Sequence, residues 1–172
     1  MKKKYKKGEG PVALSFGMIF SVLLMIFFVI VAFMVIKHFL NVKDCAKIGI
    51  FVDNLQTEVD KSWNSQSSIF LFEQEIPSKI EYVCFADLSK NFIGEHQDVG
   101  EEIEIYRGKK ANFFLSPIKK SCDMPYFNIQ HLNIEKITIN ENPFCIKINK
   151  GKVKMRIEKK FDDRLVNVYK EE

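Results

Sequence analysis

The chain has 172 residues, with 26 lysines and arginines, 22 aspartates and glutamates, and a formal net charge of +4. Residues 37–172 hold 21 basic and 21 acidic side chains, so the positive excess comes from the N-terminal tail. A main body of neutral net charge argues against a general nucleic-acid binder, which presents a basic face.

The first predicted element runs from Pro11 to Ile36, 26 residues without a charged side chain. About 20 apolar residues cross a bilayer core as a helix, so this stretch predicts a transmembrane helix. A cleaved signal has a shorter apolar region, of about 7–15 residues, and ends in a small-x-small site. Residues 32–39 lack that site, and we therefore expect a retained anchor in the lipid bilayer.

The flanking charges predict the orientation of this anchor. Residues 1–10 carry five lysines and a single glutamate, whereas the basic residues after Ile36 are spread out. Cytoplasmic flanks carry the Lys/Arg excess. We expect a single-pass protein of the cell membrane, with a cytoplasmic tail at 1–10 and an extracytoplasmic part at 37–172.

Small residues recur every four positions within the apolar stretch, at Ala13, Gly17 and Ser21. They fall on one face of a helix, and small residues at this spacing let two membrane helices approach closely. One interpretation is a packing stripe for a partner helix, from a membrane protein or from a second copy. The other is that small residues are ordinary in membrane helices.

Residues 37–63 form a juxtamembrane segment whose later part is amphipathic. From Ala46 to Trp63, apolar side chains recur at steps of three or four residues, which predicts a helix. They are Ile48, Phe51, Val52, Leu55, Val59 and Trp63. The sequence leaves open whether this helix and the membrane helix are one rod or two pieces.

Residues 64–172 are expected to form a β-rich extracytoplasmic domain, mostly antiparallel, which makes the fold class α+β. Runs rich in aromatic and β-branched residues predict its strands. These are Ile69–Ile76, Lys79–Ala86, Glu102–Tyr106, Asn112–Leu115, Phe144–Ile148, Lys152–Glu158 and Leu165–Tyr169, with Ile134–Ile139 as an extra candidate. Asn149-Lys150-Gly151 predicts a hairpin turn between two of them. Residues 87–101 are polar and predict a surface loop.

Charge is unevenly distributed along the outer part. Residues 44–104 hold 13 acidic and 4 basic side chains, and residues 105–172 hold 8 acidic and 15 basic. The two halves either fold against each other and interleave their charges, or form a two-sided domain that stacks head to tail with its own copies.

Four cysteines, Cys45, Cys84, Cys122 and Cys145, all lie in the expected outer part. An even number there predicts two disulfides with three connectivities. The pairing of sequence neighbours, Cys45 with Cys84 and Cys122 with Cys145, closes the shorter loops. A zinc site is the alternative, but zinc ligands show tighter Cys/His spacing than this chain offers.

The densest charge feature of the outer part is a basic cluster around the predicted hairpin. It contains Lys147, Lys150, Lys152, Lys154 and Arg156. One interpretation is an ordinary solvated strand face. The other is a contact for anionic glycans, lipid headgroups or an acidic neighbour.

The sequence shows none of the common catalytic motifs. There is no nucleotide-binding loop, GxSxG elbow or HExxH helix, and the three histidines are scattered. We therefore expect no catalytic residues, no metal site, no cofactor and no enzyme activity.

The order of parts resembles archaeal type IV pilin-like proteins, and more loosely small single-pass membrane proteins of archaea. The resemblance covers Lys6-Lys7-Gly8, the apolar helix and the amphipathic continuation to Trp63. It implies peptidase cleavage after Gly8, with Glu9 as the new N-terminus, and bundling of the helices into a filament. Ala13 stands where many pilins carry a glutamate that aligns subunits.

Two functional hypotheses follow. The first is a cell-envelope protein of pilin-like architecture with a structural or adhesive role, which forms a homo-oligomer or filament. The second is a bitopic anchor that presents a disulfide-stabilised binding domain to a membrane complex or an extracellular ligand.

Overall fold

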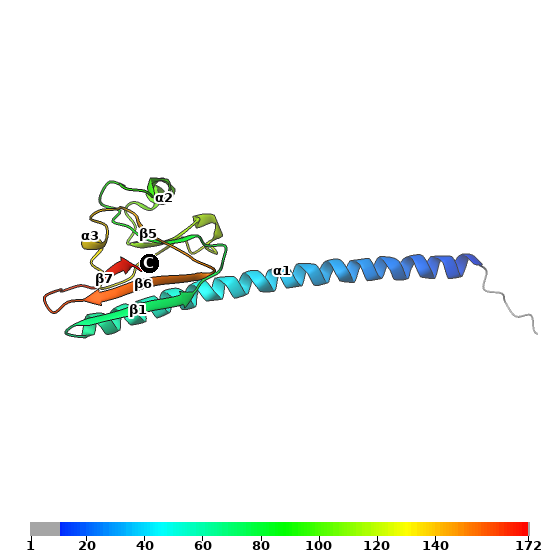
Figure 1. The fold of residues 1–172 in the computed structure, drawn as a ribbon. Helices are drawn as coiled ribbons and strands as arrows, with labels where there is room; N and C mark the ends of the chain where they lie inside the picture. Colours follow the sequence, from blue (N-terminus) through cyan, green and yellow to red (C-terminus); the bar gives the residue numbers. More distant parts are fainter. Residues whose placement is uncertain (1–10, 172) are drawn as a thin grey trace, which may run out of the picture. The chain divides into compact units, whose positions relative to one another are not determined.

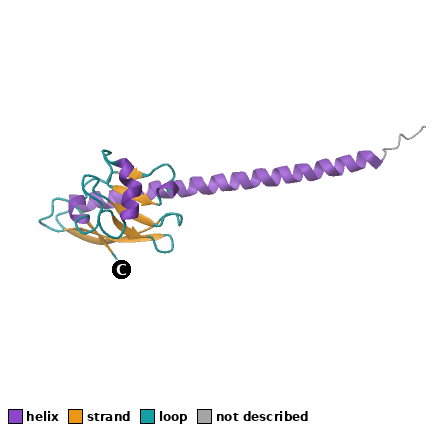
Figure 2. Cartoon of the chain, turned by 90° about the horizontal axis from the view of Figure 1, so that it is seen from above, coloured by secondary structure: helices purple, strands orange, loops and turns teal. Residues whose placement is uncertain are grey.

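A computed structural model describes residues 11–171 of the chain, which divide into two compact units, Met1–Val42 and Lys43–Glu172. The helix α1 (Pro11–Asn64) includes both predicted helical segments. All of the described strands belong to the second unit (Figure 2). The remaining elements are β1 (Ser68–Glu75), β2 (Tyr82–Phe85), α2 (Gln97–Ile103), η1 (Glu104–Tyr106), β3 (Phe113–Ser116), η2 (Ile118–Lys120), β4 (Tyr126–Phe127), α3 (Ile134–Ile137), β5 (Phe144–Lys147), β6 (Lys152–Lys159) and β7 (Asn167–Lys170).

The first unit is helical throughout its described part and is uncharged as far as Ile36. Every side chain described between Phe16 and Val42 is exposed, and the most apolar 18-residue window has a mean hydropathy of 3.2. Exposed apolar surface of this extent is unfavourable in water. By length and composition this helix can cross a membrane, and a membrane anchor and a signal sequence both meet that description.

The second unit is built around the amphipathic segment of α1. Ile48, Phe51, Leu55 and Val59 are completely buried, at the helical spacing that the sequence predicts. Trp63, which the same pattern predicts on the apolar face, is instead partly exposed. The helical prediction for residues 46–63 is confirmed.

A three-stranded antiparallel sheet in the order β1-β6-β7 lies beside this segment (Figure 1). Its strands alternate, so that Val153, Met155 and Ile157 are fully buried while the intervening basic residues face away from the core. The ring centroids of Phe72 on β1 and Phe51 on α1 lie 5.8 Å apart. The sheet and helix therefore share one apolar layer.

A second antiparallel sheet, in the order β4-β3-β2-β5, covers the other side of this core. Phe85 and Phe113 face the core, whereas Phe114 belongs to a second apolar cluster together with Val99 and Ile103 near α2. Strands buried on both faces explain the continuous apolar run Phe113–Leu115. The α+β class with antiparallel sheets is confirmed.

Two predicted strands are helical instead. The range 102–106 contains the end of α2 and η1, because Val99 and Ile103 lie four residues apart and are both buried on one helical face. The range 134–139 contains α3, whose start is capped by the Asn133 side chain, which accepts a hydrogen bond from the Lys136 N–H at 3.1 Å. The predicted surface loop at 87–101 also includes the beginning of α2.

The predicted turn at Asn149–Gly151 is confirmed, but the prediction that the strands on either side of it pair as a hairpin is wrong. The N–H of Asn149 donates to the carbonyl of Lys152 at 2.9 Å, and the reciprocal bond measures 3.0 Å. Lys150 and Gly151 both have positive φ, as a two-residue type I′ turn requires. Beyond the turn the strands separate, since β5 pairs with β2 while β6 pairs with β1 and β7.

Two disulfides are present, as predicted, but the prediction that each joins cysteines adjacent in sequence is wrong. Cys45 bonds to Cys122 and Cys84 bonds to Cys145, over sequence separations of 77 and 61 residues. Loop-closure entropy changes by only about 0.6 kcal/mol per doubling of loop length, so the folded geometry decides the pairing. Cys84 and Cys145 lie directly opposite each other on β2 and β5.

The acidic and basic halves of the outer part fold against each other, as the first interpretation of the charge pattern predicts. β1 from the acidic half pairs along its whole length with β6 from the basic half. Ion pairs also join the halves, including Lys120 with Glu81 at 3.4 Å. The sequence asymmetry is therefore largely interleaved within one domain.

We predict that Phe51→Ala lowers the free energy of unfolding by about 3–5 kcal/mol, because the ring is fully buried between the two sheets. Urea denaturation of the detergent-solubilised protein measures this change. Ile50→Ala is the matched control, since Ile50 is 57% exposed and its truncation is expected to cost about 0.5 kcal/mol or less. Equal effects of the two substitutions would contradict the described core.

Candidate functional site

Four of the five predicted basic residues line one groove of the second unit. Strand alternation places Lys152 and Lys154 on the outer face of β6, while Lys147 ends β5 and Lys150 lies in the turn. The groove has a volume of about 560 Å³. It is lined by Glu73, Lys147, Asn149, Lys150, Lys152, Lys154 and Glu171, and we call it the basic groove.

Arg156, the fifth predicted residue, does not line the basic groove. Its guanidinium carbon lies 5.0 Å from the centre of the Tyr169 ring, and its Nε lies 3.7 Å from Glu158 Oε2. A cation over an aromatic face, with a carboxylate beside it, is already satisfied electrostatically. Arg156 therefore belongs to the outer face of the sheet rather than to the groove.

Glu73 is the central acid of the basic groove. Its two carboxylate oxygens each lie 3.1 Å from a lysine ammonium group, Lys152 on one side and Lys154 on the other. Hydrogen bonds from Lys152 and then Lys154 lower the pKa of Glu73 below its usual value. Glu73 is thus ionised at neutral pH and offsets part of the charge of these two lysines.

Lys147 and Lys150 carry the remaining positive charge of the groove. Both are exposed, and neither forms an ion pair with any residue in the range 11–171. Lys150 is fixed at the tip of the Asn149–Gly151 turn, where the reciprocal backbone hydrogen bonds hold it. The groove therefore offers two unpaired ammonium groups beside two that share one carboxylate, and its four lysines against Glu73 and Glu171 leave a formal charge of +2, which suits an anionic partner.

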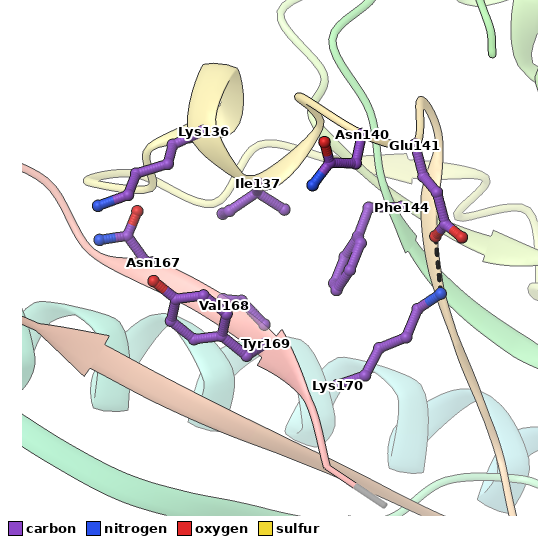
Figure 3. Close-up of a pocket in the computed structure, with 9 residues that line it drawn as sticks. All are labelled: Lys136, Ile137, Asn140, Glu141, Phe144, Asn167, Val168, Tyr169 and Lys170. Atoms are coloured by element: carbon purple, nitrogen blue, oxygen red, sulfur yellow. Dashed lines mark hydrogen bonds and ion pairs between the residues drawn. The ribbon is translucent and has the colours of Figure 1, made fainter. Parts of the chain in front are cut away.

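A second hollow, of about 300 Å³, lies beside β7 (Figure 3). Ile137 from α3, Phe144 from β5 and Val168 from β7 supply its apolar surface. At the rim, Lys170 Nζ lies 2.7 Å from Glu141 Oε2 and 5.0 Å from the centre of the Phe144 ring. We call this hollow the β7 pocket.

The β7 pocket adjoins the edge of β7 that faces away from β6, where Val168 is buried. The Val166 N–H donates to the His131 carbonyl at 2.9 Å, and the Asn133 N–H donates to the Val166 carbonyl at 2.8 Å. Backbone groups alternate in direction along a strand, so the N–H and carbonyl of Val168 point the same way. No hydrogen bond from the described residues reaches them on that side. The sequence carries no signal for this pocket, because its walls come from three separated segments.

His131 forms the clearest polar contact at the other end of the α1 segment. Its ring stacks on Trp63 with centroids 3.7 Å apart, and its Nδ1 lies 2.9 Å from Asp60 Oδ1. The neighbouring Gln130 N–H donates to Gln56 Oε1 at 2.8 Å. These contacts fasten the loop before α3 to α1. All four cysteines are in disulfides, so no thiol nucleophile accompanies the histidine–carboxylate pair.

The remaining predicted residues belong to the first unit. Gly8 and Glu9 lie outside the described residues. Ala13, Gly17 and Ser21 fall on α1, where a Cβ added at Gly17 has open space around it and the Ser21 hydroxyl donates to the Met18 carbonyl at 2.8 Å. Among the described residues, no group of three or more His, Cys, Asp or Glu side chains is arranged to hold a metal ion.

We predict that the pKa of the Glu73 carboxyl lies below its ordinary value of 4.5 in NMR titrations of the folded protein. A lowered pKa means that the stabilising contribution is present at neutral pH and is lost as the pH falls through the folded-state pKa. The double variant Lys152→Gln/Lys154→Gln should return the midpoint toward 4.5. A midpoint that does not move would show that these lysines do not hold the carboxylate.

Comparison of the chain with known proteins finds no matching family model, no matching curated protein and no matching solved structure. The pilin-like resemblance therefore rests on the residues between Lys6 and Trp63 and stays a prediction. The functional argument has to come from the two units themselves.

Proposed function

We propose that this protein is a membrane-anchored component of the cell envelope, with pilin-like architecture and a structural or adhesive role. The observation that carries the proposal is the division of α1 into two environments. From Phe16 to Ile36 its side chains are exposed and uncharged, and nearly all are apolar, whereas from Ile48 to Val59 one face is fully buried. The N-terminal part of such a helix suits a lipid environment, and its C-terminal part suits a protein core.

The two disulfides support an extracytoplasmic location for the second unit. Disulfides persist in oxidising compartments and are rare in the cytosol. The five lysines of residues 1–10 favour a cytoplasmic N-terminus, which in a single-pass protein places the second unit on the extracytoplasmic side. The proposed orientation thus agrees with two independent features, one on each side of the apolar stretch.

In the pilin-like form of the proposal, cleavage after Gly8 releases the lysine tail and leaves Glu9 as the N-terminus. The face that carries Ala13, Gly17 and Ser21 then packs against the corresponding helix of another copy. The second unit is displayed outside this helical bundle. The role of the second unit is structural or adhesive, and its surface contacts other molecules of the cell envelope or the surroundings.

We predict that the intact mass of the membrane-extracted protein lacks residues 1–8 and rises by the mass of four hydrogens on reduction. Mass spectrometry with and without a reductant measures both changes. Peptide mapping without reduction should recover Cys45 linked to Cys122 and Cys84 linked to Cys145. A full-length mass would overturn peptidase processing and leave the simple anchor as the better account.

The β7 pocket favours a second candidate function, an anchored domain that binds an extended peptide segment. Val168 is 2% exposed, so an added strand has to displace the side chains that cover it before it pairs with the unpaired N–H and carbonyl of this residue. The apolar surface of Ile137 and Phe144 can take one apolar side chain of that segment. Both features lie on the same edge, where residues 131–133 already pair with Val166.

We predict that heptapeptides selected by phage display on the immobilised full-length protein share one apolar position. Their binding should fall at least tenfold in Val168→Pro, which removes the outward N–H while the neighbouring ladder bonds of β7 remain. Leu71→Asp, at an exposed position on β1, is the control and should bind as the wild type does. Peptides that bind Val168→Pro unchanged would exclude strand addition at this edge.

A further inference from the structure

The second unit has two distinct ends, because β1 runs antiparallel to the α1 segment that begins at Lys43. At one end, Lys47 Nζ on α1 lies 3.5 Å from Glu75 Oε2, at the end of β1. At the other, the hydroxyls of Ser62 and Ser68 are hydrogen-bonded. We call these the Lys43 end and the Asn64 end.

The turn of the basic groove belongs to the Lys43 end. Glu75 lies directly opposite Lys152 across the β1–β6 ladder. One residue further, the Ile76 N–H donates to the Gly151 carbonyl at 2.9 Å. Lys150 precedes Gly151 in this turn, and the N–H of Ile148 donates to the Glu81 carbonyl at 2.9 Å, which holds the end of β5 to the start of β2. The uncompensated lysines thus lie at the end where the domain begins.

Three other lysines at the Lys43 end are paired with acids. Their Nζ atoms lie 3.4–3.7 Å from a carboxylate oxygen, and the pairs are Lys47 with Glu75, Lys79 with Asp44 and Lys120 with Glu81. Lys147 and Lys150 have no such partner among residues 11–171, and neither do the exposed Lys43 and Lys119. The unpaired charge at this end is therefore positive.

The Asn64 end differs, because its lysines are engaged. Lys159 Nζ donates to the carbonyls of Trp63 and Ser65, at 2.9 and 2.6 Å. Lys160 lies 3.6 Å from Glu158, and Lys61 lies 2.6 Å from Glu58. At this end, among the described residues, Arg164 in the turn after β6 is exposed without an ion pair, so unpaired positive charge is present here as well but is denser at the Lys43 end.

We propose that Lys147 and Lys150 bind the phosphate groups of anionic lipids in the same membrane that holds α1. This inference rests on the proposed membrane anchor. Lys43 is the seventh residue after Ile36, the end of the uncharged stretch, and in a helix this rise is about 10 Å. That distance is comparable to the headgroup layer and to the screening length at physiological salt. Each lysine near an anionic surface favours it about fivefold.

The contact has a mechanical role that neutral lipid does not supply. A single helix lets the domain rotate and tilt freely above the bilayer. The ammonium groups of Lys147, at the end of β5, and Lys150, in the hydrogen-bonded turn, add a second point of attachment on another part of the domain. Anionic lipid therefore fixes the orientation in which the basic groove faces the membrane and the Asn64 end faces away.

Amine footprinting of the full-length protein in nanodiscs tests this proposal. Nanodiscs of phosphatidylcholine alone are compared with nanodiscs that contain 30% phosphatidylglycerol, using an uncharged acetylating reagent and peptide mass spectrometry. Acetylation of Lys147 and Lys150 should fall at least threefold with phosphatidylglycerol and recover in 0.5 M salt. Lys109 and Lys110, which are exposed and precede β3 at the opposite end of its sheet, should not change.

Variants separate the contact from a general effect of the charged bilayer. In Lys147→Gln/Lys150→Gln, the lipid-dependent protection of Lys152 should disappear, whereas the control Lys109→Gln/Lys110→Gln should retain it. Equal acetylation in both nanodiscs would overturn the headgroup contact while leaving the anchor intact. Protection by an added anionic polysaccharide in neutral nanodiscs, but not by phosphatidylglycerol, would also overturn it. A chain that does not enter nanodiscs at all would contradict the anchor itself.

Discussion

The second unit depends on the burial of one helical stripe between two sheets. Phe51 is the centre of this arrangement, since its ring lies 5.8 Å from that of Phe72 on β1 and 6.1 Å from that of Phe113 on β3. Neither sheet is large enough to bury its own apolar face. A three-stranded and a four-stranded sheet become stable together because α1 supplies the surface that both share.

This constraint explains which features the sequence reveals. Ile48, Phe51, Leu55 and Val59 repeat at helical spacing because they meet the sheets along a single face. The alternation along β6 is equally clear, because one of its faces is core and the other is solvent. Where a helix or strand buries a single face, the periodicity of its apolar residues is enough to predict it.

The features that the sequence did not reveal depend on contacts between distant segments. The short helices α2 and α3 leave too few residues for a period to be recognised, so Ile103 and Ile137 were interpreted as strand residues. The disulfide pairing follows from the adjacency of β2 and β5, which no local pattern encodes. The basic cluster was predicted from local sequence, but Glu73, which pairs with two of its lysines, comes from β1 and lies far away in the chain.

The crossed disulfides also determine how the domain would respond to tension. Cys45 lies two residues after the start of the second unit, and its partner Cys122 lies beyond β3. A force applied at the membrane side therefore passes through this bond directly to Cys122, so that the intervening 76 residues carry no tension. The buried stripe of α1 and the β1 strand both lie within that shielded stretch. The covalent connection thus keeps residues 46–121 out of the line of force, whereas β6 and β7 lie beyond Cys122 and remain in it.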